Sequence, residues 1–186
     1  MPFLDLLRPV SDEELRQLSA KNPGWQLERW KDGRLIVSPI GRESGYLEAL
    51  LLGQLYRWNQ QRGLGLVFSS ATGFKLPDGS LLSPDAAFVF RDHWLGLSPE
   101  EREAFPPLAP DVAFEIRSRS QTLEELRQKA RAYLANGTRV VVLLDPYTHR
   151  VEVHRQGGAE EYPDPQRIPL DPELPGFTLD AQELFL

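Results

Sequence analysis

The sequence contains no cysteine and only three histidines, His93, His149 and His154. The absence of cysteine excludes disulfides, thiolate nucleophiles and zinc sites with Cys ligands. No two of the histidines share helical spacing, so a histidine-based metal cluster is not expected either. A metal site in this chain would therefore use oxygen ligands, and oxygen ligands favour Mg²⁺ or Mn²⁺.

Long hydrophobic runs and an N-terminal signal pattern are also missing. The aliphatic run Val140–Leu144 is far too short to cross a bilayer. We therefore expect a cytoplasmic protein that has no membrane partner.

Length and composition are those of one globular domain. The chain has 186 residues, of which 41% are hydrophobic and 26% charged, and this is enough to bury a sizeable core. The net charge of −6 argues against a protein that coats nucleic acid, because such proteins are usually basic. It leaves room for an enzyme acting on nucleic acid, since such an enzyme needs only a local basic path and concentrates acids at its metal site.

Local patterns predict helices that alternate with strands. Ser11 and Thr122 each precede a glutamate by three residues, which is the capping-box spacing at the start of a helix. Val140–Leu144 is purely aliphatic, which indicates a central strand covered on both faces. Helices are expected over 11–20, 42–61, 98–104, 122–136 and 180–184, and strands over 25–30, 34–38, 66–70, 73–76, 86–90, 112–117, 140–144 and 151–154.

Three of these elements set the fold class. Strand 112–117, helix 122–136 and strand 140–144 are predicted to form a βαβ unit with a right-handed crossover. The expected fold class is α/β, with a mixed β-sheet core flanked by helices. We expect residues 1–186 to form a single domain, with residues 1–24 as a helical N-terminal extension.

Glu115 is unusual because it lies in the apolar segment Val112–Ile116, which is expected to be a covered strand. A buried carboxylate costs roughly several kcal/mol unless it is paired or binds a metal. Two interpretations are open. Glu115 is either half of a buried ion pair, for example with Arg117 two residues along the same strand face, or a metal ligand.

Asp85 and Lys129 are the next candidates. Asp85 follows Pro84 at the start of the apolar strand 86–90, so it is either a turn residue or a second acid at a site. Lys129 lies three residues after Leu126, at the border of the apolar stripe of the helix that follows the Glu115 strand. It either extends to solvent along the edge of that face or points at the sheet beside Glu115.

Two further glutamates lie near helix starts. The apolar stripe of helix 42–61, extended back by four residues from Leu47, reaches Glu43. Glu43 is either an inward-pointing acid or a first-turn residue favoured by the helix dipole. Glu125 is expected to be structural, because it completes the capping box of Thr122.

These residues together resemble the PD-(D/E)XK superfamily of restriction-endonuclease-like nucleases, and within it the Uma-two family. The resemblance spans residues 25–185. The matching segments are Asp32-Gly33-x-Leu35, Ser38-Pro39, Ser83-Pro84-Asp85, Pro110-Asp111-x-x-x-Glu115-Ile116-x-Ser118, Lys129-x-x-x-Tyr133-x-x-x-Gly137, Leu144-Asp145-Pro146 and Leu174-Pro175-Gly176.

The resemblance implies a restriction-endonuclease-like domain with a Mg²⁺ (or Mn²⁺) site on Asp85, Glu115 and the backbone carbonyl of Ile116. It implies an endonuclease, in particular an endodeoxyribonuclease, with Lys129 and Glu43 as further catalytic residues. The superfamily's usual lysine, two residues after the glutamate, is replaced here by Arg117, and Lys129 is the matching lysine of the Uma-two family.

The chain departs from the family pattern at two further places. The family's frequent histidine is replaced by Ser44, and its Ser-Pro-Ser appears as Ser118-Arg119-Ser120. Arg117 and Arg119 are candidates for contacts with flanking phosphates. Because nucleases of this type often pair to cut both strands, we expect a homodimer acting on nucleic acid, with DNA as the first expectation.

Two alternatives to a nuclease stay open on the sequence. The same fold could keep its acids and lose activity, and would then serve as a nucleic-acid- or partner-binding module. A glycoside hydrolase with two carboxylates needs them roughly 5–10 Å apart and no metal, but it gives a buried lysine no role.

Overall fold

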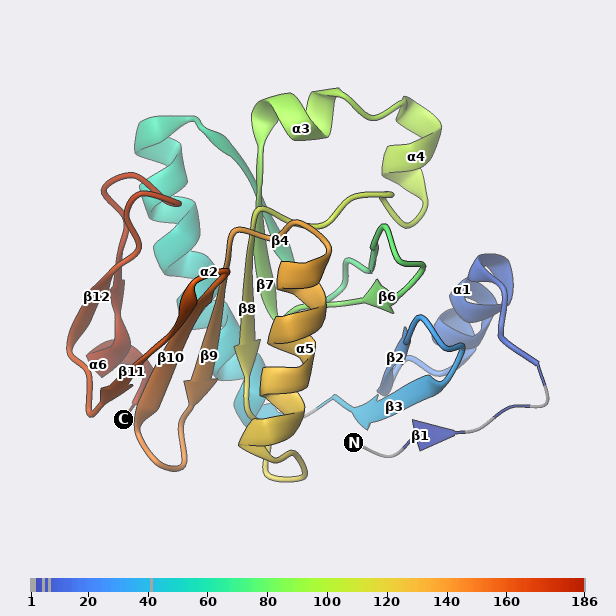
Figure 1. The fold of residues 1–186 in the computed structure, drawn as a ribbon, viewed down its shortest axis with the longest axis horizontal. Helices are drawn as coiled ribbons and strands as arrows, with labels where there is room; N and C mark the ends of the chain where they lie inside the picture. The colour runs from blue at the N-terminus through green and yellow to red at the C-terminus, as the bar shows by residue number, and fades with distance from the viewer. Residues whose placement is uncertain (1–2, 5, 7, 41, 186) are drawn as a thin grey trace.

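The computed structural model describes residues 3–4, 6, 8–40 and 42–185, without the side chains of residue 3 and residues 42–44. Its centre is a six-stranded sheet with the order β11-β10-β9-β8-β7-β4 (Figure 1). The strands β8 (Val112–Ile116) and β9 (Val140–Asp145) are parallel, and the other neighbours are antiparallel. The remaining strands of this sheet are β4 (Gly65–Ser69), β7 (Ala86–Phe90), β10 (Arg150–Arg155) and β11 (Gly158–Pro163).

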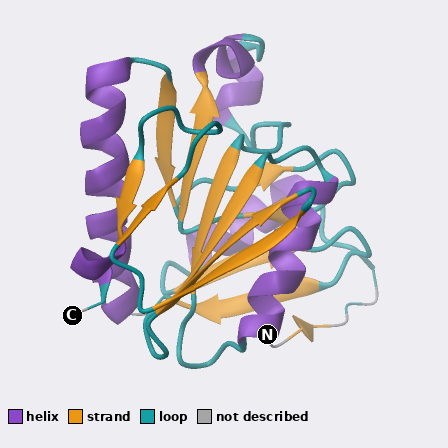
Figure 2. Cartoon of the chain, turned by 60° about the vertical axis from the view of Figure 1, so that its left-hand side comes forward, coloured by secondary structure: helices purple, strands orange, loops and turns teal. Residues whose placement is uncertain are grey.

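Two long helices cover the two faces of this sheet, as Figure 2 shows in side view. Helix α2 (Arg42–Arg62) lies on one face and α5 (Leu123–Ala135) on the other. Successive side chains of β8 point alternately towards α2 and towards α5. Phe114 and Ile116 belong to the core under α2, whereas Ala113 belongs to the core under α5. Glu115 has the same parity as Ala113 and therefore faces α5.

A second sheet lies beside the first and has the order β1-β3-β2-β6-β5. Its strands are β1 (Phe3–Leu4), β2 (Trp25–Arg29), β3 (Leu35–Pro39), β5 (Phe74–Lys75) and β6 (Leu81–Leu82). The predicted hairpin of β2 and β3 is present, with Gly33 at φ 86 in its turn. Helix α1 (Asp12–Lys21) begins with the Ser11–Glu14 capping box and contacts β2.

The remaining elements are short. Helices α3 (Arg91–Leu95) and α4 (Pro99–Glu103) connect β7 to β8. Strands β12 (Arg167–Pro169) and β13 (Thr178–Asp180) form a separate antiparallel pair, followed by α6 (Ala181–Leu184). Among the described residues, no helix is both long and apolar enough to span a membrane.

The predicted α/β class with a mixed sheet flanked by helices is confirmed, and the parallel pair β8–β9 is joined by α5 as expected. Strand β9 is buried along its whole length, in agreement with its aliphatic sequence. The sequence did not predict β1, β6 or α3. The division of the chain into one domain with an extension at residues 1–24 stays a prediction.

Candidate metal centre

The candidate site lies where β7 and β8 diverge. The last paired residues of the two strands are Ala86 and Phe114, and β8 continues to Ile116 without a partner from β7. Asp85 fills this gap, and its Oδ2 accepts a hydrogen bond of 2.6 Å from the backbone N–H of Ile116. Because the N–H and C=O of one strand residue point to the same edge, the carbonyl of Ile116 is also directed towards Asp85.

Glu115 is 3% exposed and points away from α2. Its Oε1 lies 2.7 Å from Lys129 Nζ and 3.2 Å from the hydroxyl of Tyr133, which donates to it. Lys129 and Tyr133 are four residues apart on α5, so they face the sheet one above the other. The parallel strand and its crossover helix therefore bring Glu115 and Lys129 together, as the chain order predicted.

A second buried carboxylate shares the same lysine. Glu28, on β2, is 3% exposed, and its Oε1 lies 3.0 Å from Lys129 Nζ. That oxygen also accepts a 2.7 Å hydrogen bond from the N–H of Ser83. Gln26, on the same strand face, donates to the carbonyl of Ser83 at 2.9 Å. Glu28 and Gln26 of β2 thus hydrogen-bond to the backbone N–H and the carbonyl of Ser83, the residue that precedes Pro84-Asp85.

The pKa values of these groups reflect burial and an excess of acids. Burial raises the pKa of the Asp85 carboxyl to about 6, against the opposing effects of the Ile116 N–H and of Lys129. Burial also raises the pKa of Glu115 to about 8, and Asp85 and Glu28 add to this rise while Lys129 opposes it. For Lys129, burial alone would lower the pKa, but the attraction of Glu115 and Glu28 outweighs it and the pKa is raised.

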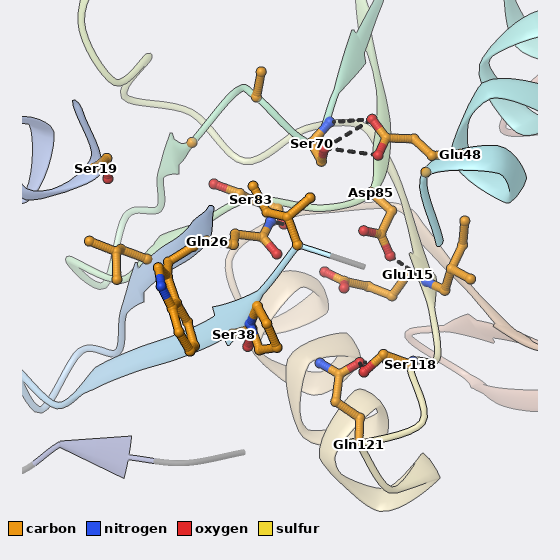
Figure 3. A pocket seen from close by; sticks show the side chains of 18 of the residues that line it. Ser19, Gln26, Ser38, Glu48, Ser70, Ser83, Asp85, Glu115, Ser118 and Gln121 are labelled. Carbon is orange, nitrogen blue, oxygen red and sulfur yellow. Dashed lines mark hydrogen bonds between the residues drawn. The ribbon is translucent and has the colours of Figure 1, made fainter. Parts of the chain in front are cut away.

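The acids open onto a cavity of about 410 Å³. Figure 3 shows the carboxylates of Asp85 and Glu115 on one side of it, close to Ser118 and Gln121. Glu48, from α2, lies above Asp85, and both of its oxygens lie 2.9 Å from the Ser70 hydroxyl. The cavity is thus bounded by both sheets and by the first half of α2.

The donor set fits a hard divalent cation. Asp85, Glu115 and Glu28 carry two negative charges more than Lys129 offsets when all are ionised, and a divalent cation would balance them. Among the described residues no three acidic or histidine side chains converge as a ready ligand cluster. The protein ligands would therefore be the two carboxylates and the Ile116 carbonyl, with water completing the shell, as is usual for Mg²⁺.

The contacts of Glu115 and Lys129 exclude the alternative roles that the sequence left open for them. Glu115 does not pair with Arg117, because Arg117 pairs with buried Asp145 at 2.9 Å. Lys129 does not extend to solvent, since it is only 2% exposed. Asp85 does more than form a turn, because its carboxylate replaces the missing strand partner of Ile116.

Two other predicted site residues, Arg117 and Arg119, lie apart from these contacts. The Arg117 and Arg119 guanidiniums lie 5.4 Å and 4.9 Å from the centre of the Tyr147 ring, beside the cavity rather than in its lining. Glu43 is in the first turn of α2, and its side chain lies outside the described part of the chain.

Glu28 and Glu48 were not singled out from the sequence. Glu48 borders the Leu47–Leu51–Leu55 stripe of α2, so its position next to the buried face was an available signal. Glu28 gave none, because in Trp25–Arg29 it looks like a solvent-facing residue of a hairpin strand.

The fold is shared with a solved structure whose description names a putative nuclease. A crystal structure described as "a putative nuclease belonging to DUF820", from Anabaena variabilis, superimposes with a TM-score of 0.77 over 95% of this chain and 98% of that chain. The two sequences are 20% identical, so the likeness shows a shared fold. No curated protein matches the chain.

The family is established by sequence. The Uma2 family model, described as "Putative restriction endonuclease", matches residues 12–182, and the chain belongs to this family. Family and fold together support a nuclease. The resemblance expected from Asp85, Glu115 and Lys129 is thereby confirmed at the level of the family.

Proposed function

We propose that this protein is a metal-dependent endonuclease that hydrolyses phosphodiester bonds of nucleic acid, with DNA as its substrate. The observation that carries the proposal is the pair of acids, half-buried Asp85 and buried Glu115, beside the buried ammonium of Lys129 at a cavity. Such a desolvated, charge-unbalanced cluster is unfavourable in a purely structural role, and it becomes balanced when a divalent cation binds.

Asp85, Glu115 and the Ile116 carbonyl would hold Mg²⁺ or Mn²⁺. When bound, this ion supplies Lewis-acid stabilisation of a phosphate oxygen and activates water. The raised pKa of Lys129 keeps its side chain protonated at neutral pH. Lys129 would therefore act as a hydrogen-bond donor to phosphate oxygens or to the attacking water, and not as the base that deprotonates it.

The test is cleavage of supercoiled DNA, single-stranded DNA and RNA in Mg²⁺ or Mn²⁺, with Glu115→Gln as the comparison. The substitution removes the charge and nearly preserves the shape. We expect cleavage by the wild type that chelator and Glu115→Gln both abolish, and binding of metal by calorimetry in the wild type only. Cleavage by Glu115→Gln at the wild-type rate would refute the metal site.

A second candidate is a nuclease-fold protein without activity that binds nucleic acid or a protein partner. The observation in its favour is Arg117, which occupies the superfamily's lysine position and is held by Asp145 and by the carbonyl of Gln121 instead of facing the acids. Metal affinity that Glu115→Gln removes, without cleavage of any nucleic acid, would favour this candidate. The homodimer and the cytoplasmic location also stay predictions, the first of which light scattering can test.

A further inference from the structure

The cavity extends well beyond the acids. Figure 3 shows Ser19 on the opposite side from Asp85 and Glu115, with Gln26 and Ser38 between them. The lining changes character along this direction. Asp85, Glu115, Ser118 and Gln121 line the end at the acids, whereas Trp25, Leu27, Pro39, Ile40 and Phe105 contribute the apolar part of the wall.

Trp25 is the most unusual residue of this apolar part. It starts β2 and pairs in register with Pro39 on β3, so the two side chains lie next to each other on one face. Trp25 is nevertheless 48% exposed, and Ile40 beside it is 63% exposed. A large aromatic side chain left half-exposed at a cavity is a candidate for contact with a ligand.

The charges of the lining limit what that ligand is. Of the described residues that line the cavity, only Lys129 is cationic, and it is buried between Glu115 and Glu28. A surface that grips the two phosphate backbones of a duplex needs several exposed Lys or Arg side chains. The part of a substrate that lies along this cavity, away from the metal, is therefore uncharged.

A nucleobase is the uncharged part of a nucleic acid that meets these conditions. Bases stack on indole rings whatever their sequence, because every base has a π-face. The Gln121 amide offers a polar contact. Its oxygen accepts from the N–H and hydroxyl of Ser118, and its nitrogen points into the cavity (Figure 3).

We infer that the cavity binds one unpaired nucleotide, with its phosphate at Asp85 and Glu115 and its base stacked on Trp25. The substrate class is then single-stranded or locally unpaired nucleic acid, because a base inside a duplex cannot reach the indole. This inference rests on the proposed function for the position of the phosphate, and it adds which form of nucleic acid the site accepts.

Binding tests the inference separately from cleavage. We would measure fluorescence anisotropy of a phosphorothioate strand, which resists cleavage, and of the blunt duplex of the same sequence, in Mg²⁺. We expect tighter binding of the single strand and a loss of about tenfold in its affinity in Trp25→Ala. Trp25→Phe should restore most of the affinity, because a phenyl ring also stacks. A 2-aminopurine base in the strand should be quenched by wild type and much less by Trp25→Ala.

Tyr56→Ala is the matched control. Tyr56 is 57% exposed on α2 and is not part of the cavity lining, so its loss should leave strand binding unchanged. Strand binding that depends on Trp25, without any cleavage, would support the inference. It would count only against the proposed endonuclease activity. Metal-dependent cleavage with equal binding of duplex and strand, or with no effect of Trp25→Ala, would overturn the inference and leave the endonuclease standing.

Discussion

Glu28 accepts a 2.7 Å hydrogen bond from the backbone N–H of Ser83, two positions before Asp85 in the chain. The bond connects β2 of the second sheet to the segment that leads into β7 of the first. Since the same glutamate oxygen also contacts Lys129, one side chain fixes both the approach to Asp85 and the position of the ammonium.

Glu28→Gln is predicted to slow cleavage without removing the metal. The amide is nearly the same shape but carries no charge, so Lys129 loses one of its two anionic partners. We expect a decrease of roughly 10- to 100-fold in kcat, the usual effect of losing an outer partner of a site, with metal affinity within a few-fold of wild type.

The measurements are single-turnover cleavage across pH and calorimetric titration of Mn²⁺. Glu173→Gln is the control, because Glu173 is also a buried acid with a basic partner, Arg155, but lies away from the site. A purely structural role for Glu28 would lower stability and leave the pH profile of the folded variant unchanged. That result would contradict the prediction.

Lys129→Met is predicted to destabilise the fold in a pH-dependent way. The variant leaves Glu115 and Glu28 buried without a cation, which costs roughly 3 kcal/mol. The loss should shrink at pH 5, where Glu115 is protonated with or without Lys129. The pKa of Glu115 is about 8 in the wild type, and because Lys129 lowers that pKa, the removal of Lys129 raises it further. Urea unfolding at pH 9 and pH 5 measures the difference. Arg131→Met, which breaks an exposed pair with Glu124, should cost less than about 1 kcal/mol at either pH.

The stability of the metal-free protein is predicted to fall as the pH rises. Asp85 and Glu115 have pKa values of about 6 and about 8, above their usual values. Between about pH 6 and pH 8, above the range where the other acids titrate, these two carboxyls therefore bind more protons in the folded state than in the unfolded state. Rising pH removes those protons and reduces the free energy of unfolding.

Metal should reverse this trend. A divalent cation binds the deprotonated carboxylates, so the rise in Tm on adding Mn²⁺ should be larger at pH 8 than at pH 6. Thermal unfolding followed by circular dichroism, with and without Mn²⁺, measures both effects. In Glu115→Gln the upper part of the pH dependence and the effect of Mn²⁺ should both disappear. An unchanged dependence would mean that Glu115 does not titrate in this range.

Replacement of the two arginines near Tyr147 is predicted to affect different properties of the protein. Arg117 pairs with Asp145, which is 2% exposed, so Arg117→Ala should mainly lower stability. Arg119 is exposed, so Arg119→Ala should leave stability within about 0.5 kcal/mol. Its loss should weaken binding of nucleic acid and reduce the salt dependence by about one phosphate contact. Anisotropy titrations at several salt concentrations measure this, and an unchanged salt slope would remove Arg119 from the binding surface.

Most of the fold could be predicted from local sequence, and the exceptions have local reasons. The capping boxes at Ser11 and Thr122 predicted the starts of α1 and α5. Strand β6 consists of Leu81 and Leu82 alone, which is too short for a periodic pattern. Helix α3 has Phe90 at its N-cap and no side-chain hydrogen bond there, so no capping signal precedes it.

The sequence predicted a site residue where a charged side chain occurs within an apolar segment. Glu115 in an apolar strand was such a conflict, and Lys129 followed from the strand-to-helix order. Glu28 could not be found in this way, because its neighbour Arg29 makes the strand look solvent-exposed. Its burial comes from the docking of one sheet on another, which is a tertiary contact that no local pattern encodes.

The wide separation of Glu28, Asp85, Glu115 and Lys129 along the chain has a consequence for synthesis. Until α5 has emerged, Glu115 lacks both its ammonium partner and its cover, and until β2 has docked, the segment before Asp85 is not fixed. The proposed cutting site therefore forms only after α5 has been made and β2 has docked, so a fragment that ends before α5 would lack it.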